Sequence, residues 1–158
     1  MPVDHQKRLR IAIAADHNGV VLKAHIANEL AKRGFSVVDL GTNDTQVVDY
    51  PYLCARIGKE LKMDNVDRAV MIGGSGQGET IALNKIRGIR AGLCNSLFDA
   101  EVSSGHNNSN VLVLAGKVVS SDFAMQIVDM WLKTPFKGGI HQDRLDLISQ
   151  IEDGRDLA

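Results

Sequence analysis

Aromatic residues, cysteine and long apolar runs are all scarce in this sequence, and each scarcity excludes a class of protein. Aromatics make up only 4% of the 158 residues, so the core must be built mainly from Val, Ile, Leu, Ala and Met. Cys54 and Cys94 are too few for a disulfide framework or a metal site. Both stand in apolar runs, which predicts buried free thiols and a reducing compartment, the cytoplasm.

Membrane and nucleic-acid partners are also disfavoured. No apolar run reaches the roughly 18 residues of a membrane span, and the run at residues 11–15 is too short for a signal peptide. A formal net charge of −1 gives no electrostatic reason to expect nucleic acid or an anionic membrane. The basic stretch at residues 5–10 is too short to act as a nucleic-acid arm.

The length and pattern of the chain favour one domain over residues 1–158, with a polar tail from about residue 153. Short apolar runs typical of strands alternate with longer stretches of helical periodicity. This alternation predicts an α/β fold, a three-layer α/β/α Rossmann-like sandwich around a five-stranded parallel sheet. Strands are predicted at residues 10–15, 36–40, 68–73, 91–94 and 111–115. Helices are predicted at residues 20–33, 79–85, 97–105, 121–133 and 143–152, and a further helix is predicted to begin after a cap at Asp49.

Ligands of such folds bind beyond the carboxyl ends of the strands, which directs attention to three polar segments, residues 16–19, 73–79 and 105–110. The glycine-dense run at residues 73–79 fits neither the dinucleotide fingerprint nor the P-loop. Its backbone N–H groups lead into a helix and predict an anion site, for a phosphate or for an enediolate oxygen also held by Ser75. The alternative is a tight turn that needs glycine only for its dihedral angles.

Each candidate side chain also has an ordinary structural interpretation. Glu79 could simply complement the dipole of its helix, and Asp16 could cap the helix that follows it. His106 could end a helix in a polar loop. His141 and Arg144 share one helix face, which is either a solvated charged surface or a phosphate-binding face. No pair of histidines has the spacing of metal ligands.

Five motifs follow one another in a specific order along the chain: Asp16-His17-Asn18-Gly19, Asp49-Tyr50-Pro51, Gly73-Gly74-Ser75-Gly76-Gln77-Gly78-Glu79, Asn84-Lys85-Ile86-x-Gly88-Ile89-Arg90 and His106-Asn107-Asn108. This ordered set resembles the ribose-5-phosphate isomerase B family, which includes galactose-6-phosphate isomerase subunits. The resemblance covers about residues 10–150. It implies a five-stranded parallel sheet and a homodimer whose active sites use residues of both chains; pairing of dimers into tetramers stays open.

The resemblance also implies roles for single residues. One branch of the family carries a cysteine base at the position of Gly73, and the other uses a glutamate that matches Glu79. Asp16 and His106 would serve opening of the sugar ring, and Ser75 with the loop amides would hold the enediolate. Arg144 would bind the phosphate. The candidate substrate contacts are His17, Gly74, Gly76, Gly78, Asn107, Lys117, His141 and Arg144.

Two positions depart from the family pattern at the phosphate end, since Lys117 and Ile140 replace arginines. Arginine offers a planar bidentate fork that lysine lacks, and isoleucine offers an anion nothing. The sequence shows no cluster of metal ligands, so we expect an aldose–ketose isomerase that needs no metal or cofactor and transfers a proton through a cis-enediol(ate), with Glu79 as base. Its substrate is ribose 5-phosphate or, alternatively, a tetrose or hexose phosphate; a non-catalytic sugar-phosphate-binding protein is the remaining alternative.

Overall fold

Within residues 8–158, which the computed structural model describes, five parallel strands form one sheet, as the sequence predicts. Residues 5–7 of the basic stretch lie outside the described part. The elements are β1 Arg10–Ala15, α1 Val20–Lys32, β2 Ser36–Asp39, α2 Tyr50–Lys62, β3 Arg68–Gly73, α3 Gln77–Asn84, β4 Ala91–Leu93, α4 Leu97–Gly105, β5 Val111–Ala115, α5 Ser121–Lys133 and α6 Ile140–Glu152. The strand order, which the sequence does not predict, is β2-β1-β3-β5-β4.

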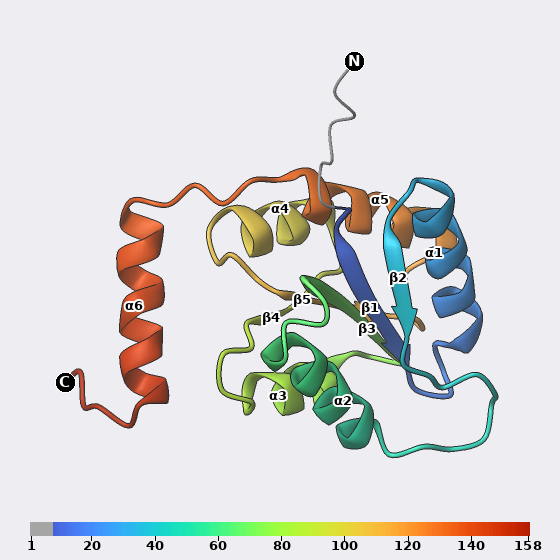
Figure 1. The fold of residues 1–158 in the computed structure, drawn as a ribbon, viewed down its shortest axis with the longest axis horizontal. Coiled ribbons are helices and arrows are strands. Elements are labelled where there is room, and N and C mark those ends of the chain that lie inside the picture. Colours follow the sequence, from blue (N-terminus) through green and yellow to red (C-terminus); the bar gives the residue numbers. More distant parts are fainter. Residues whose placement is uncertain (1–7) are drawn as a thin grey trace.

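Helices cover both faces of this sheet, which confirms the three-layer α/β/α class (Figure 1). Successive strand residues point to opposite faces, so each strand feeds two separate cores. In β1, Ile11 and Ile13 pack with α1, α4 and α5, whereas Ala12 and Ala14 pack with α2 and α3. Burial on both faces explains why the central strands read as continuous apolar runs.

The predicted boundaries hold to within a few residues, with two differences at helix starts. Helix α3 begins two residues before Glu79, and α6 begins at Ile140 rather than Asp143. Asp49 occupies the N-cap of α2, but its side chain makes no capping hydrogen bond. Asp16 does not cap α1 either, because its carboxylate instead accepts the backbone N–H of Asn18 at 2.8 Å.

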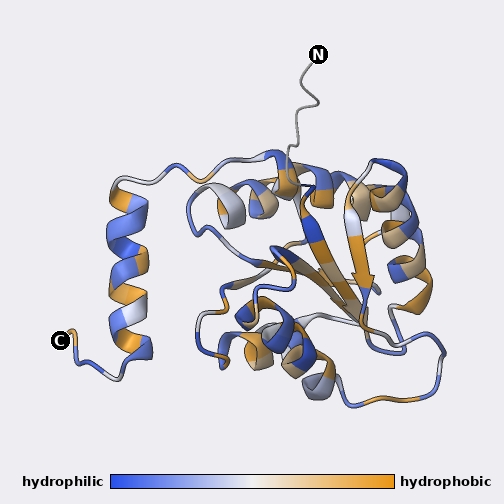
Figure 2. Ribbon diagram, viewed as in Figure 1, coloured by the Kyte–Doolittle hydropathy of each residue, from blue (hydrophilic) through white to orange (hydrophobic). Residues whose placement is uncertain are grey.

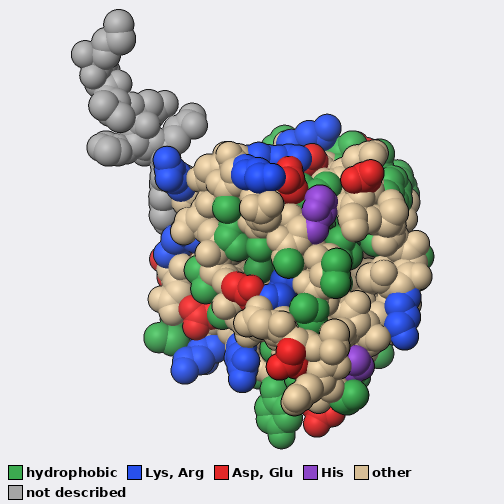
Figure 3. Space-filling view, turned by 90° about the vertical axis from the view of Figure 1, so that its right-hand side faces the viewer, with side chains coloured by type: hydrophobic (Ala, Val, Ile, Leu, Met, Phe, Trp, Pro, Cys, Tyr) green, Lys and Arg blue, Asp and Glu red, His purple; other side chains and the backbone are tan. Residues whose placement is uncertain are grey.

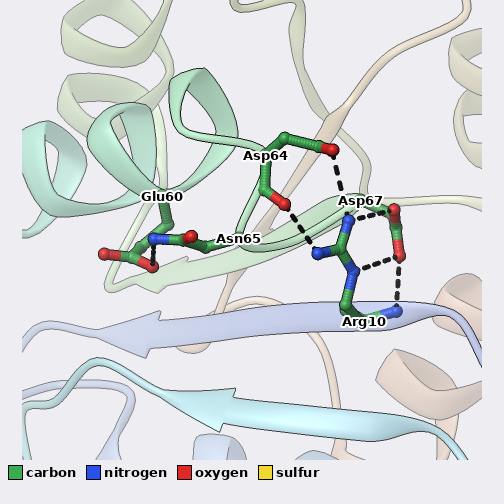
Figure 4. A network of polar contacts seen from close by, with 5 residues as sticks. All are labelled: Arg10, Glu60, Asp64, Asn65 and Asp67. Carbon is green, nitrogen blue, oxygen red and sulfur yellow. Dashed lines mark hydrogen bonds and ion pairs between the residues drawn. The ribbon is translucent and has the colours of Figure 1, made fainter.

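An ion-pair network ties the amino edge of the sheet together (Figure 4). The Arg10 side chain at the start of β1 donates to both carboxylate oxygens of Asp67, at 3.1 and 2.8 Å. It also donates to the carbonyl of Asp64 at 2.6 Å. These contacts join β1 to the turn between α2 and β3 and so hold the strand starts in register.

Helix α6 stands apart from the other elements (Figures 1 and 2). Its apolar residues are largely exposed, including Ile148 at 50% and Ile151 at 60% of their surface, while Leu145 is buried. On the face beside α1 and β2, acidic and basic side chains are interspersed, in line with the low net charge (Figure 3). None of the helices described over residues 8–158 is long and apolar enough to span a membrane.

Candidate active site

The glycine-rich loop leaves β3 at the carboxyl edge of the sheet and enters α3. Gly76 is the N-cap of α3 and has a φ of 74°, in the left-handed region that favours glycine. A Cβ on Gly78 would lie 2.3 Å from the Tyr50 hydroxyl oxygen. Turn geometry and close packing therefore account for these two glycines, while the loop still delivers backbone amides to a helix N-terminus.

Glu79 lies in the first turn of α3 and folds back over the end of β3. It is only 4% exposed. A Cβ on Gly73 would lie 2.1 Å from its Oε1 and 2.6 Å from its Oε2. The carboxyl group of Glu79 therefore lies where a side chain at position 73 would project, which is the position of the family's alternative cysteine base.

The carboxyl group of Glu79 is protonated more readily in this environment than it would be in water. Burial raises the pKa of its carboxyl, and the nearby Asp16 raises that pKa further through its charge and a hydrogen bond. A hydrogen bond from the backbone acts in the opposite direction. A carboxylate with a raised pKa is a stronger base near working pH, as proton abstraction from carbon requires.

Asp16 reaches this position because the ends of β1, β3 and β5 are aligned. Ala15 pairs with Ile72, and Gly73 pairs with Ala115. The polar residues that follow these strands therefore meet at one edge. We call this group the carboxyl-edge cluster: Asp16, His17, Gly74, Ser75, Gly76, Gly78, Glu79 and Lys117.

The remaining side chains of this cluster lie around the loop. The Ser75 hydroxyl is exposed and accepts the Gln77 N–H at 3.2 Å, which leaves its own proton to donate. The exposed Lys117 runs past Gly74 and donates its backbone N–H to the Gly74 carbonyl at 3.0 Å. His17 accepts the Val48 N–H at 3.4 Å through Nδ1.

Tyr50 is a candidate site residue that the sequence did not assign. Its hydroxyl packs against Gly78, in the first turn of α3 and directly before Glu79. The hydroxyl can donate or accept a hydrogen bond, which suits a contact with a sugar oxygen. The signal was present in the Asp49-Tyr50-Pro51 motif, but no spacing rule connects that motif to the glycine-rich loop.

The other predicted residues lie elsewhere. Helix α4 runs antiparallel to the strands, so its C-cap His106 lies at the amino edge, where β5 begins. Five residues of strand span about 16 Å, so His106 and Glu79 lie at opposite edges of the sheet. The expectation that residues 105–110 join the carboxyl ends of the strands is wrong within one chain, because a segment that precedes a strand starts at its amino end.

His106 has its own neighbours at the amino edge. Its ring stacks on that of His141, with the centroids 4.0 Å apart and the planes at 17°. Both rings line a cavity of about 230 Å³ together with Asn107 and Arg144. We call these four residues the amino-edge cluster. The structure thus brings the predicted site residues together in two groups rather than one.

The described part of the chain presents neither a thiol of low pKa nor a group of three potential metal ligands. Burial raises the pKa of Cys54 and of Cys94 to about 12, so neither is a thiolate near neutral pH. Both thiols are free and buried, as predicted. Among residues 8–158, no three His, Cys, Asp or Glu side chains are grouped so that they could hold a metal ion.

Comparisons with known proteins agree on one family. The Ribose/Galactose Isomerase family model matches residues 11–148. Ribose-5-phosphate isomerase B of Escherichia coli strain K12 is 39% identical over 146 residues, which cover 92% of this chain and 98% of that protein. The structure of the Clostridium thermocellum ribose-5-phosphate isomerase B superposes with a TM-score of 0.91 at 42% identity and covers 92% and 99% of the two chains. The structure of the Mycoplasma genitalium ribose-5-phosphate isomerase B with bound ribulose-5-phosphate superposes with a TM-score of 0.89 at 37% identity. The match covers 93% of this chain and 98% of that one.

Proposed function

The chain belongs to the ribose/galactose isomerase family, and we propose that it interconverts ribose 5-phosphate and ribulose 5-phosphate. The observation that carries this proposal is the match over nearly the full length of ribose-5-phosphate isomerase B enzymes, one of them holding ribulose-5-phosphate. The buried carboxyl of Glu79, beside a glycine-rich loop, supports the same chemistry.

We propose that Glu79 is the base. In the open-chain aldose, Glu79 takes the proton from C2, the electrons of that C–H bond form the C1–C2 double bond, and the electrons of the C1 carbonyl move onto O1 to give an enediolate. The proton of the C2 hydroxyl passes to O1, the electrons left on O2 form the C2 carbonyl, and the C1–C2 double bond takes back from the Glu79 carboxyl the proton that becomes the new C1–H. In this proposal the loop amides and the Ser75 hydroxyl stabilise the enediolate oxygen, and one lost donor of this kind typically costs about 2.7–4 kcal/mol of transition-state stabilisation.

We also propose that a complete site needs two chains. Asp16 and His106 are the candidates for ring opening, yet they lie at opposite edges of the sheet in one chain. A second copy, placed so that its amino-edge cluster faces the carboxyl-edge cluster of the first, would supply the missing half. The exposed apolar face of α6 and a cavity of about 680 Å³ between α6 and the α3–β4 side support such a dimer.

A cytoplasmic location is part of the same proposal. Cys54 and Cys94 are buried and unpaired, as expected of a protein that folds in a reducing compartment. A sugar phosphate is also an intracellular type of substrate. Fractionation of cells that express the tagged protein tests this point, and recovery in a secreted or membrane fraction would contradict it.

The exact sugar phosphate is the point at which this chain departs from its family. Lys117 and Ile140 stand where the family has arginines, and Ile140 is 59% exposed at the start of α6. This favours a second candidate substrate, a phosphate of different chain length. Purified protein should be assayed on tetrose, pentose and hexose phosphates, with and without EDTA.

We expect the highest kcat/KM on ribose 5-phosphate and no loss of activity with EDTA. A preference for a tetrose or hexose phosphate would replace the substrate but keep the isomerase chemistry. Loss on chelation with recovery on adding a divalent ion would replace proton transfer by a metal-assisted mechanism. No turnover of any sugar phosphate would contradict the function and favour a binding protein.

A further inference from the structure

Lys137 lies in the segment between α5 and α6, and neither the motifs nor the predicted site include it. Its Nζ lies 3.2 Å from Nε2 of His106. Its backbone N–H donates to the carbonyl of Gly105 at 2.9 Å, and its side chain passes that glycine closely enough that a Cβ there would meet Lys137 Cε at 3.5 Å. The side chain is thus held across the end of α4 and directed at the amino-edge cluster.

Basic side chains converge on this cluster. Lys137 approaches His106 from one side, His141 stacks on the same ring, and Arg144 follows His141 on the same helix face. Within residues 8–158, no acidic side chain forms an ion pair with Lys137, His141 or Arg144. Burial lowers the pKa of His141, and the charges of His106, Arg144 and Lys137 lower it further. Like charges gathered without a counter-charge repel one another, unless an anion joins them.

The donors of Lys137 are only partly used. An ammonium has three N–H donors, and one of them suffices for the contact with Nε2 of His106. Gly138 and Gly139, with φ values of 64° and 57°, form the turn that lets Lys137 and the first turn of α6 reach the same histidine. The remaining donors of Lys137 are therefore available to oxygens of a ligand in the cavity beside His106.

Resting on the proposed function, we propose that Lys137 is a phosphate-binding residue of this site, where its ammonium replaces the guanidinium that is absent at Ile140. Ile140 lies three residues further along and offers only an exposed apolar side chain. A lysine supplies a point charge rather than a planar fork. Lys137, His141 and Arg144 then hold the phosphate together. The phosphate lies closer to His106 than it would if an arginine at position 140 bound it.

The test compares Lys137→Met with Lys133→Met, a matched loss of an exposed lysine from the last turn of α5. For Lys137→Met we expect the KM for ribose 5-phosphate to rise about tenfold with kcat nearly unchanged, because a charge-assisted hydrogen bond is lost. Competitive inhibition by inorganic phosphate should weaken in parallel. Lys137→Arg should restore both values, and Lys133→Met should change neither.

Other outcomes overturn the inference. An unchanged KM would show that Lys137 does not touch the phosphate. A fall in kcat at constant KM would show that Lys137 acts only by holding His106. If the wild type turns over no sugar phosphate, the proposed function fails, and calorimetric titration with inorganic phosphate decides on Lys137 by itself. Equal phosphate affinities of wild type and Lys137→Met would then reject the inference.

Discussion

The carboxyl group of Glu79 occupies the space into which a side chain at Gly73 would project, since a Cβ there would lie 2.1 Å from Oε1. In this arrangement the site holds either a glutamate from α3 or a side chain at position 73, and not both. The two branches of the family, with a cysteine at one position or a glutamate at the other, are therefore alternative ways to fill one space. The absence of a side chain at Gly73 is a condition for the position that the Glu79 carboxyl occupies, and therefore for the role proposed for it.

Gly73→Ala should inactivate the enzyme although it removes no functional group. The new Cβ cannot coexist with the Glu79 carboxyl, so the base must move, and small displacements of catalytic groups cost on the order of 100-fold in rate. In a Glu79→Gln background the same change should cost little more, because its effect passes through Glu79. Steady-state kinetics of the two single variants and the double variant measure this. Additive losses would show that Gly73 acts independently of Glu79.

Glu79→Gln should keep the fold and lose turnover. The amide has the same shape but accepts no proton, and general-base catalysis typically contributes about 10²- to 10⁴-fold. We expect kcat to fall by at least that range while substrate still protects the protein against thermal unfolding. Turnover within a few-fold of the wild type would mean that another group carries the proton.

The same variant should be more stable than the wild type near neutral pH. The pKa of Glu79 is raised in the folded state above its ordinary 4.5. The free energy of unfolding therefore decreases as the pH rises from about 4.5 through that raised pKa. Above this window the buried charge destabilises by a constant amount, and glutamine removes that cost. Thermal unfolding should give a higher Tm for Glu79→Gln at about pH 8 and a smaller difference at about pH 4. A lower Tm at the higher pH would contradict the assigned direction of the shift.

Asp16→Asn should move the acidic limb of the pH profile to lower pH. Asp16 raises the pKa of Glu79, so a neutral amide in its place lets Glu79 ionise more easily. The measurement is log kcat/KM against pH for wild type and variant, whatever the absolute activity that remains. A limb that stays in place would show that Asp16 and Glu79 are not coupled.

Two inactive variants should complement each other if the site is shared between chains. Glu79→Gln damages the carboxyl-edge cluster and His106→Asn the amino-edge cluster, so one of the two sites in a mixed dimer contains neither change. Random pairing of co-expressed chains should recover about a quarter of the wild-type activity. As a control, Ile151→Asp on the exposed face of α6 should impair both dimerisation, measured by sedimentation, and activity. No recovery in the mixture would contradict a shared site.

Much of the fold was predictable because it rests on local patterns. Apolar runs form β1, β3 and β5, and stretches of helical periodicity lie between them. This alternation of strands and helices predicts a parallel sheet that is covered by helices. Helix boundaries are harder to predict where the periodic pattern is weak. Helix α6 begins at Ile140, three residues before the predicted start at Asp143. The Asp16 side chain is ambiguous from the sequence because a short carboxylate can serve a helix cap or a neighbouring turn equally well.

The sequence by itself determined the α/β class and the family resemblance, and it led to the proposal of Glu79 rather than a cysteine as base, because these depend on residue types and their order. Only the tertiary structure decided that His106 lies at the opposite edge from Glu79, and that Tyr50 and Lys137 reach the two clusters. It also decided that Glu79 is buried beside Asp16. Such proximities arise where separate elements pack against one another, and spacing along the chain carries no record of distances across a sheet.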